Sequence, residues 1–169
     1  GGMLVVTPGG DRGTVAALNK MTGAIVWQSG EFKDSAPYSS LLPIDTGKIR
    51  QYVVFTDKNV AGILSTTGKL LWKIPRPGQT AICSTPVYNK DGTLFVSSGY
   101  KVGCNGFKLS LAGNAFKIEQ LYEGKQMQNH HGGMVMVGDH VYGLDEGALK
   151  CIEAKTGKER WHVEISDFD

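Results

Sequence analysis

Short apolar runs alternate with polar turns along the whole chain, and the runs have the length of β-strands. Residues 15–19, 60–64, 107–111 and 149–153 each form such a run, followed by a few polar residues, a glycine and a second run. Runs of about four to eight residues bounded by Gly, Pro, Asn or Asp are typical of strands, and no segment keeps a helical period. The pattern therefore predicts an all-β fold.

The second run of each pair follows a Thr-Gly turn and ends in Trp at 22–27, 67–72 and 156–161, with a weaker copy, Ala-Gly-Asn-Ala-Phe-Lys, at 112–117. The turn glycines are therefore spaced by 45, 45 and 44 residues, at Gly23, Gly68, Gly113 and Gly157. Each copy is typical of a β-hairpin whose glycine supplies the positive φ of a tight turn. A repeat of this length is typical of propeller blades.

Each unit contains two further apolar runs ahead of its hairpin. Residues 52–55, 94–97 and 141–144 are preceded by 40–44, 85–88 and 134–137, with turn residues between the two members of each pair. That makes about four antiparallel strands per unit. We therefore predict an all-β β-propeller segment of about four four-stranded antiparallel blades in a single domain, with blade units of approximately 1–30, 37–73, 84–118 and 131–161.

The Trp that ends each hairpin is expected to pack in the seam between neighbouring blades. In the third unit, Lys117 stands where Trp is expected. We expect Phe116 to take over the packing there and the seam to be looser.

Each unit follows one pattern: a small residue, Leu or Ile, a polar residue, two residues, Thr-Gly, three residues and Trp. This pattern resembles the repeat of the pyrroloquinoline quinone (PQQ)-like β-propellers. That superfamily includes the quinoprotein dehydrogenases and the scaffold lipoprotein of the outer-membrane β-barrel assembly machinery. The resemblance covers nearly the whole chain. It implies a blade series from a seven- or eight-bladed propeller, and a periplasmic or otherwise extracytoplasmic bacterial location. It says less about function, because repeats record blade packing.

Long polar connections separate each Trp from the first strand of the next unit. In a propeller these connections run over one face toward the central funnel, where most propellers bind ligands. The segments just ahead of corresponding strands are therefore expected to meet around the funnel. The resulting candidates for ligand binding are Tyr38, Ser39, Ser84, Asn129, His130 and His131.

The string Asn-His-His-Gly-Gly at 129–133 is the most unusual of these segments. It indicates either a ligand or metal site, or a structural role in which one His caps backbone groups; we favour the structural role. Neighbouring residues of an extended strand point to opposite faces, so His130 and His131 are not expected to chelate one ion. No metal site is predicted. Ser39 and Ser84 lack the Gly-x-Ser-x-Gly elbow of a hydrolase nucleophile.

Quinoprotein dehydrogenases of this superfamily hold their cofactor with a vicinal disulfide, a stacking Trp and calcium ligands. This chain has no Cys-Cys pair, and its three Trp residues all belong to the repeat. We therefore predict a non-catalytic scaffold or binding module with a protein, peptide or carbohydrate partner at the funnel face, and expect no cofactor. The alternative is a fragment of a PQQ-dependent dehydrogenase whose PQQ and calcium site lies outside this chain.

Charge and hydropathy exclude several other classes. The chain has 18 basic and 16 acidic residues, interspersed, for a net charge of +2, so no nucleic-acid partner is predicted. No apolar stretch approaches the roughly 18 residues of a transmembrane helix. Exposed blade edges predict self-association. We expect a piece of a longer propeller, a half-ring that pairs with a second copy, or a small closed ring, and favour the first.

The three cysteines, Cys83, Cys104 and Cys151, cannot all pair within the chain. Cys151 lies in a predicted strand and is expected to be a packed thiol. Cys83 and Cys104 fall in one unit, where free thiols and a disulfide both remain open.

Overall fold

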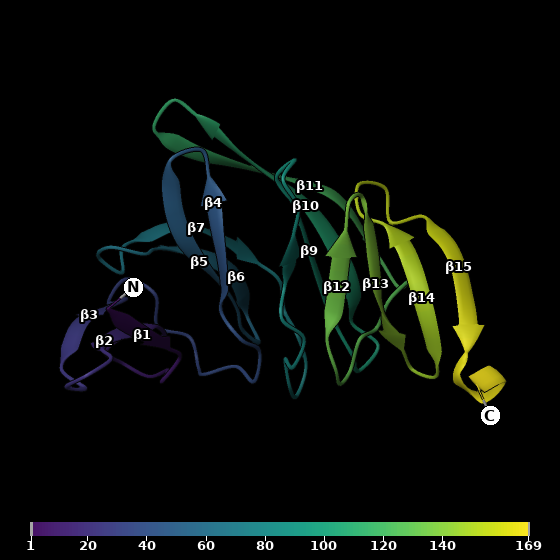
Figure 1. The fold of residues 1–169 in the computed structure, drawn as a ribbon, viewed down its shortest axis with the longest axis horizontal. Coiled ribbons are helices and arrows are strands. Elements are labelled where there is room, and N and C mark those ends of the chain that lie inside the picture. Colours follow the sequence, from purple (N-terminus) through teal and green to yellow (C-terminus); the bar gives the residue numbers. More distant parts are fainter. Residues whose placement is uncertain (1, 169) are drawn as a thin grey trace.

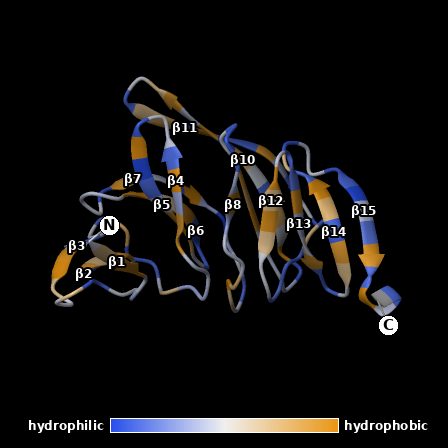
Figure 2. Cartoon of the chain, in the orientation of Figure 1, coloured by the Kyte–Doolittle hydropathy of each residue, from blue (hydrophilic) through white to orange (hydrophobic). Residues whose placement is uncertain are grey.

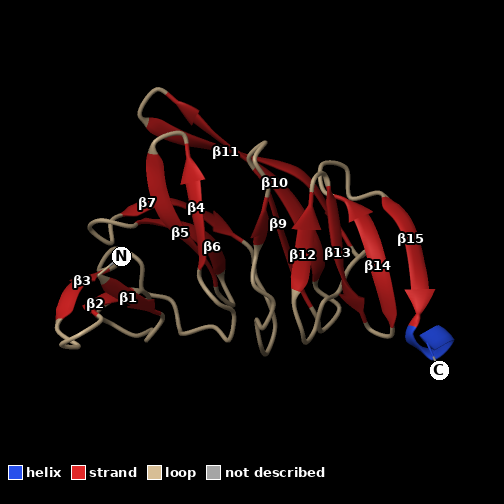
Figure 3. Cartoon of the chain, viewed as in Figure 1, coloured by secondary structure: helices blue, strands red, loops and turns tan. Residues whose placement is uncertain are grey.

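Four antiparallel sheets follow one another along the chain in the computed structural model, which describes residues 2–168. Apart from one 3-10 turn, η1 (Ile165–Phe168), the regular structure described is β-strand (Figure 3). The first sheet contains β1 (Met3–Val6), β2 (Ala16–Asn19) and β3 (Ile25–Gln28). The second contains β4 (Leu42–Thr46), β5 (Ile49–Phe55), β6 (Asn59–Leu64) and β7 (Leu70–Pro75).

The third and fourth sheets repeat this order. The third contains β8 (Val87–Tyr88), β9 (Thr93–Ser98), β10 (Gly103–Ala112) and β11 (Ala115–Gly124). The fourth contains β12 (Met134–Val137), β13 (His140–Asp145), β14 (Ala148–Glu153) and β15 (Glu159–Glu164). Within each sheet the strands pair in chain order, and the four sheets stand side by side as a fan (Figure 1). The predicted all-β series of propeller blades is confirmed, with three described strands in the first sheet.

The last hairpin of every sheet carries a register shift at the same place. The shifts lie after Ala17, Gly62, Gly106 and Cys151, and the residue before each shift pairs with an aromatic residue of the outer strand. A shift of this kind is a β-bulge, which bends and twists the strand locally. The four aromatic partners are Trp27, Trp72, Tyr122 and Trp161.

Tyr122 is therefore the third-unit counterpart of the Trp residues, and the expectation for Phe116 is wrong. The β10–β11 hairpin is longer than the others, so its aromatic residue lies nine positions after Gly113 instead of four after Gly68. Phe116 instead packs against the core between the second and third sheets. The insertion lies between the turn and the bulge, so the spacing of the turn glycines does not reveal it.

Trp27 shows how one sheet is joined to the next. Its ring is 7% exposed and packs over the Thr-Gly turn of the second sheet, and its Nε1 donates to the carbonyl of Ser65 at 3.2 Å. A Cβ added at Gly68 would lie 2.5 Å from the ring of Trp27. Glycine at this position thus serves both the positive φ of the turn and the close approach of the neighbouring ring.

Tyr122 repeats this contact between the third and fourth sheets. Its hydroxyl donates to the carbonyl of Ala154 at 2.9 Å, and a Cβ at Gly157 would lie 2.6 Å from its ring. Ala154 and Ser65 both lie three residues before the turn glycine. The seam predicted to be loose is therefore closed by the same contact as the first seam.

The middle seam is held differently. Trp72 donates from Nε1 to Gln51 Oε1 of its own sheet at 2.7 Å, while its ring joins the core between the second and third sheets. Arg76 crosses the seam, donating to the Asn105 side chain at 3.0 Å and to the Gly103 carbonyl at 2.7 Å. Burial lowers the pKa of Arg76 to about 10, which leaves the guanidinium charged at neutral pH.

We expect Trp27→Ala to lower the free energy of unfolding by about 3–5 kcal/mol, because it empties a buried ring position. Tyr122→Phe should lower it by about 1 kcal/mol, the value of one buried hydrogen bond. Trp161→Ala is the matched control for Trp27→Ala, since Trp161 occupies the same register position but is exposed. Urea unfolding followed by circular dichroism measures all three. Equal losses for Trp27→Ala and Trp161→Ala would contradict the role assigned to the seam.

Candidate functional site

The connections between sheets lie at one end of the inner strands, which are the first strands of the sheets. Equivalent residues of neighbouring connections are in contact there. Ser39, Ser84 and Asn129 recur at intervals of 45 residues, directly ahead of the inner strands. Ser84 Oγ donates to the Asn129 carbonyl at 3.0 Å and also bonds the Asn129 side-chain oxygen. The backbone N–H of Ser40 donates to Thr85 Oγ1 at 3.1 Å. Corresponding segments of neighbouring sheets are thus joined directly.

The polar side chains in these connections are buried and bonded to the main chain. Ser39 Oγ donates to the Phe55 carbonyl at 2.9 Å. Asn129 donates from Nδ2 to the Leu144 carbonyl at 2.9 Å, and its N–H donates to Ser97 Oγ at 2.9 Å. Each of these hydrogen bonds pairs a buried backbone group that has no access to water. The serines therefore act as struts between strands, with their hydroxyl protons directed at carbonyl oxygens.

Tyr38 differs from its neighbours because its side chain is 78% exposed. Only its backbone is tied to the next connection, through an N–H bond to the Ile82 carbonyl at 3.1 Å. Tyr38 lines a shallow hollow of about 210 Å³, together with residues 35–37, Asp57 and residues 80–82.

His130 and His131 lie ahead of β12, outside regular strand structure, and their rings stack with centroids 4.3 Å apart. The expectation that they point to opposite faces is therefore wrong, because it assumed an extended strand. The ring of Tyr100 meets His130 edge-on at 4.2 Å, and Gly99 leaves room for that imidazole. Within the described residues, His130 Nε2 is buried and has no hydrogen-bond partner.

Residues 2–168 contain no cluster of three His, Cys, Asp or Glu side chains that could hold a metal ion. The three cysteines are free thiols, so the Cys83–Cys104 disulfide is not formed. Cys104 and Cys151 are buried and Cys83 is half-buried. Burial raises the pKa of the Cys104 thiol.

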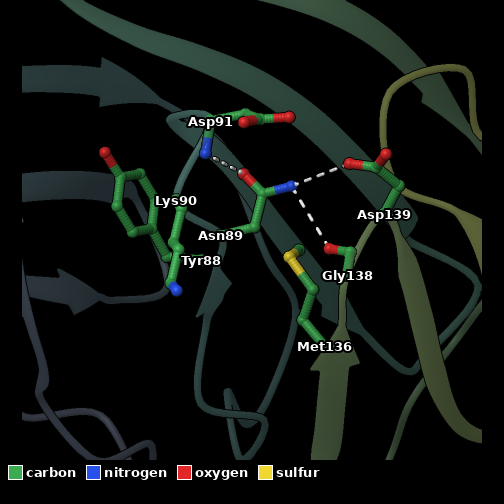
Figure 4. A pocket seen from close by; sticks show the side chains of 7 residues that line it. All are labelled: Tyr88, Asn89, Lys90, Asp91, Met136, Gly138 and Asp139. Atoms are coloured by element: carbon green, nitrogen blue, oxygen red, sulfur yellow. Dashed lines mark hydrogen bonds between the residues drawn. The ribbon is translucent and has the colours of Figure 1, made fainter.

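A further hollow lies at the opposite end of the inner strands, between the β8–β9 and β12–β13 turns (Figure 4). It measures about 520 Å³, and its lining includes Tyr88, Lys90 and Met136. A second hollow of about 270 Å³ shares Tyr88, Asn89 and Lys90 with it and continues toward β4. We call the two together the turn groove.

Polar contacts hold the turns that frame the turn groove. Asn89 Nδ2 donates to the Gly138 carbonyl and to Asp139 Oδ1, each at 3.4 Å (Figure 4). Lys155 Nζ lies 3.1 Å from Asp91 and 3.8 Å from Asp139. The hydrogen bond to Asp91 is the main cause that raises the pKa of Lys155. Sequence reasoning identified these segments only as turns, because nothing local shows that turns 49 residues apart share a hollow.

The repeated sheets joined by aromatic seams define a PQQ-like β-propeller protein. The family model described as "Outer membrane protein assembly factor BamB" matches residues 1–165, and the chain belongs to this family. No curated protein matches the sequence. Within residues 2–168, none of the helical structure is long and apolar enough to cross a membrane.

Two solved structures are similar to this chain. BamB from Moraxella catarrhalis matches with 14% sequence identity and a TM-score of 0.43, covering 96% of this chain and 58% of that one. A protein of unknown function from Bacteroides caccae matches with 13% identity and a TM-score of 0.33, covering 99% of this chain and 74% of that one. This chain therefore spans somewhat more than half the length of the Moraxella protein.

We expect Asn129→Ala to lower the free energy of unfolding by about 1–3 kcal/mol, because it removes a buried amide that joins neighbouring strands. Tyr38→Ala, in the equivalent connection but exposed, should change it by less than about 0.5 kcal/mol. Chemical denaturation of both variants measures the difference. A neutral Asn129→Ala would mean that Asn129 does not act as a strut.

Proposed function

We propose that this chain is a non-catalytic scaffold that binds a protein segment outside the cytoplasm, during the assembly of outer-membrane proteins. Membership of the BamB family supports this role and location. The non-catalytic part of the proposal depends on the hydrogen bonds that the hydroxyl groups of the candidate serines make. Ser39 and Ser84 are buried and donate to carbonyl oxygens of neighbouring strands. A serine that supports the fold in this way is not poised as a nucleophile, which needs an adjacent base.

The turn groove is the surface we assign to the partner. Tyr88 and Met136 contribute apolar surface to its lining, while Lys90, Asp91 and Asp139 contribute charges of both signs. Protein–protein interfaces likewise combine apolar contacts with polar and charged groups. Tyrosine is also among the residues that most often dominate binding energy at such interfaces. A protein segment with one apolar side chain and flanking polar groups suits this surface.

We expect Tyr88→Ala to weaken binding of a purified barrel-assembly complex, from which its own BamB-family subunit has been removed, by about tenfold or more. Biolayer interferometry with the immobilised chain gives the affinity. Tyr38→Ala is the matched control, since it removes an exposed ring at the opposite end of the inner strands and should bind like the parent. Circular dichroism establishes that both variants are folded.

Two results would count against this proposal. Loss of binding in Tyr38→Ala but not in Tyr88→Ala would move the partner to the funnel candidates. Turnover would oppose the scaffold role itself: the chain mixed with PQQ and calcium should give no quinone spectrum and no dye reduction with alcohols or sugars. Clear dye reduction would favour the dehydrogenase alternative.

A further inference from the structure

Lys90 stands where the two hollows of the turn groove meet. It lines both of them, together with Tyr88 and Asn89. From this junction the larger hollow continues to Met136 and the smaller one to Leu42, and the side chain of Lys90 is exposed. A segment bound in either hollow therefore meets Lys90 at the junction.

The two acidic side chains of the larger hollow are balanced by two lysines that lie beside it. Lys155 Nζ contacts the carboxylates of both Asp91 and Asp139. Lys108 Nζ donates to the backbone carbonyl of Asp91. Opposite charges at short range weaken the potential that either one presents to a ligand. These four side chains sum to zero charge, so the two carboxylates do not make the groove anionic.

Lys90 is the charge of the lining that stays uncompensated. In the smaller hollow, Arg50 Nη1 lies 2.7 Å from Asp45 Oδ2, so that pair also sums to zero. Within residues 2–168, Lys90 makes no salt bridge. Figure 4 shows its ammonium group directed away from Asp91 and Asp139. The groove therefore presents one free positive charge next to its apolar surface.

The apolar surface beside Lys90 is held by the cores on both sides and suits an aromatic ring. Tyr88 packs against the core between the second and third sheets, and a Cβ added at Gly92 would lie 3.5 Å from its hydroxyl. Met136 packs against the core between the third and fourth sheets. Aromatic rings and methionine sulfur both interact favourably with an aromatic partner. A bound aromatic side chain would find one of each in this hollow.

We propose that the segment bound in the turn groove carries an aromatic side chain and, two residues from it, an acidic side chain; this inference rests on the scaffold function proposed above. The ring lies against Tyr88 and Met136, and the carboxylate meets the ammonium group of Lys90. In an extended chain, residues two apart point to the same face and lie about 7 Å from each other, whereas residues three apart point to opposite faces. Lys90 is therefore the residue that selects the partner by charge.

The test uses four labelled peptides with blocked ends, titrated with the full chain and followed by fluorescence polarisation. The first, Thr-Glu-Thr-Phe-Thr-Glu-Thr, has an acid two residues to either side of the ring. The second and third carry Gln or Lys in place of both acids. The fourth, Glu-Thr-Thr-Phe-Thr-Thr-Glu, has the composition of the first but places the acids on the opposite face. We expect the first to bind about three- to fivefold more tightly than the second and fourth, and the Lys peptide to bind most weakly.

Lys90→Glu is the variant that decides the proposal. It should weaken binding of the first peptide about tenfold, because like charges then face each other, and it should make the Lys peptide the tightest of the four. Lys33→Glu is the matched control, since it makes the same change in net charge at an exposed lysine of a connection at the opposite end of the inner strands. It should bind all four peptides like the parent. Circular dichroism establishes that both variants are folded.

Salt gives a second readout of the same charge pair. Raising sodium chloride from about 0.05 to about 0.5 M should weaken binding of the first peptide and leave the Gln peptide nearly unchanged, because exposed charges are screened over a shorter distance at high salt.

Several outcomes would overturn the proposal. They are no binding of the first peptide, equal affinity of the parent for the Glu, Gln and Lys peptides, and an order of affinities that Lys90→Glu leaves unchanged. Equal binding of the first and fourth peptides would contradict the spacing of two residues. An equal effect of Lys33→Glu would reduce the preference to net charge.

Failure here is distinguishable from failure of the scaffold function. If the peptides bind without regard to charge while Tyr88→Ala still weakens binding of the assembly complex, the acidic preference is wrong and the proposed function stands. If Tyr88→Ala leaves binding of the complex intact, the assignment of the groove to the partner fails, whatever the peptides do.

Discussion

The contact between an aromatic ring and the Thr-Gly turn of the next sheet is the interaction on which the rest of the structure depends. A sheet with one apolar face cannot bury that face alone, and a turn without a Cβ lets a ring lie directly on its backbone. Trp27 and Tyr122 make this contact with almost identical partners, including a carbonyl three residues before the glycine. The bulge beside each aromatic residue recurs in every sheet, so all four aromatic residues occupy the same register position.

Hydrogen bonds of polar side chains also join neighbouring sheets. Arg76 crosses the middle seam and donates to oxygens of Ser98, Gly103 and Asn105 in the third sheet. Ser84 and Asn129 join the connections at one end of the inner strands. Such groups are costly to bury unless they are bonded, so each of them also fixes one arrangement of neighbouring strands.

The partner surface that we propose is one that the seams leave open. The turn groove depends on adjacent sheets being held at a fixed spacing, because its walls are turns from different sheets bonded through Asn89. A repeat architecture thus supplies binding surfaces without any dedicated element, and single substitutions at exposed positions can separate binding from folding.

The sequence by itself determined the all-β class, the repeat, and the positions of most strands, because alternating apolar runs and the spacing of the turn glycines are local properties. It also predicted that the segments around Ser39, Ser84 and His130 precede corresponding strands, but the structure was needed to show that Asn129 is the residue that joins Ser84. Only the tertiary structure decided that Tyr122 replaces Trp, because an insertion after Gly113 hides the register until strands pair. The same holds for the stacking of His130 on His131 and for the turn groove. Those features depend on backbone conformation outside strands and on contacts between distant turns, which no short-range pattern encodes.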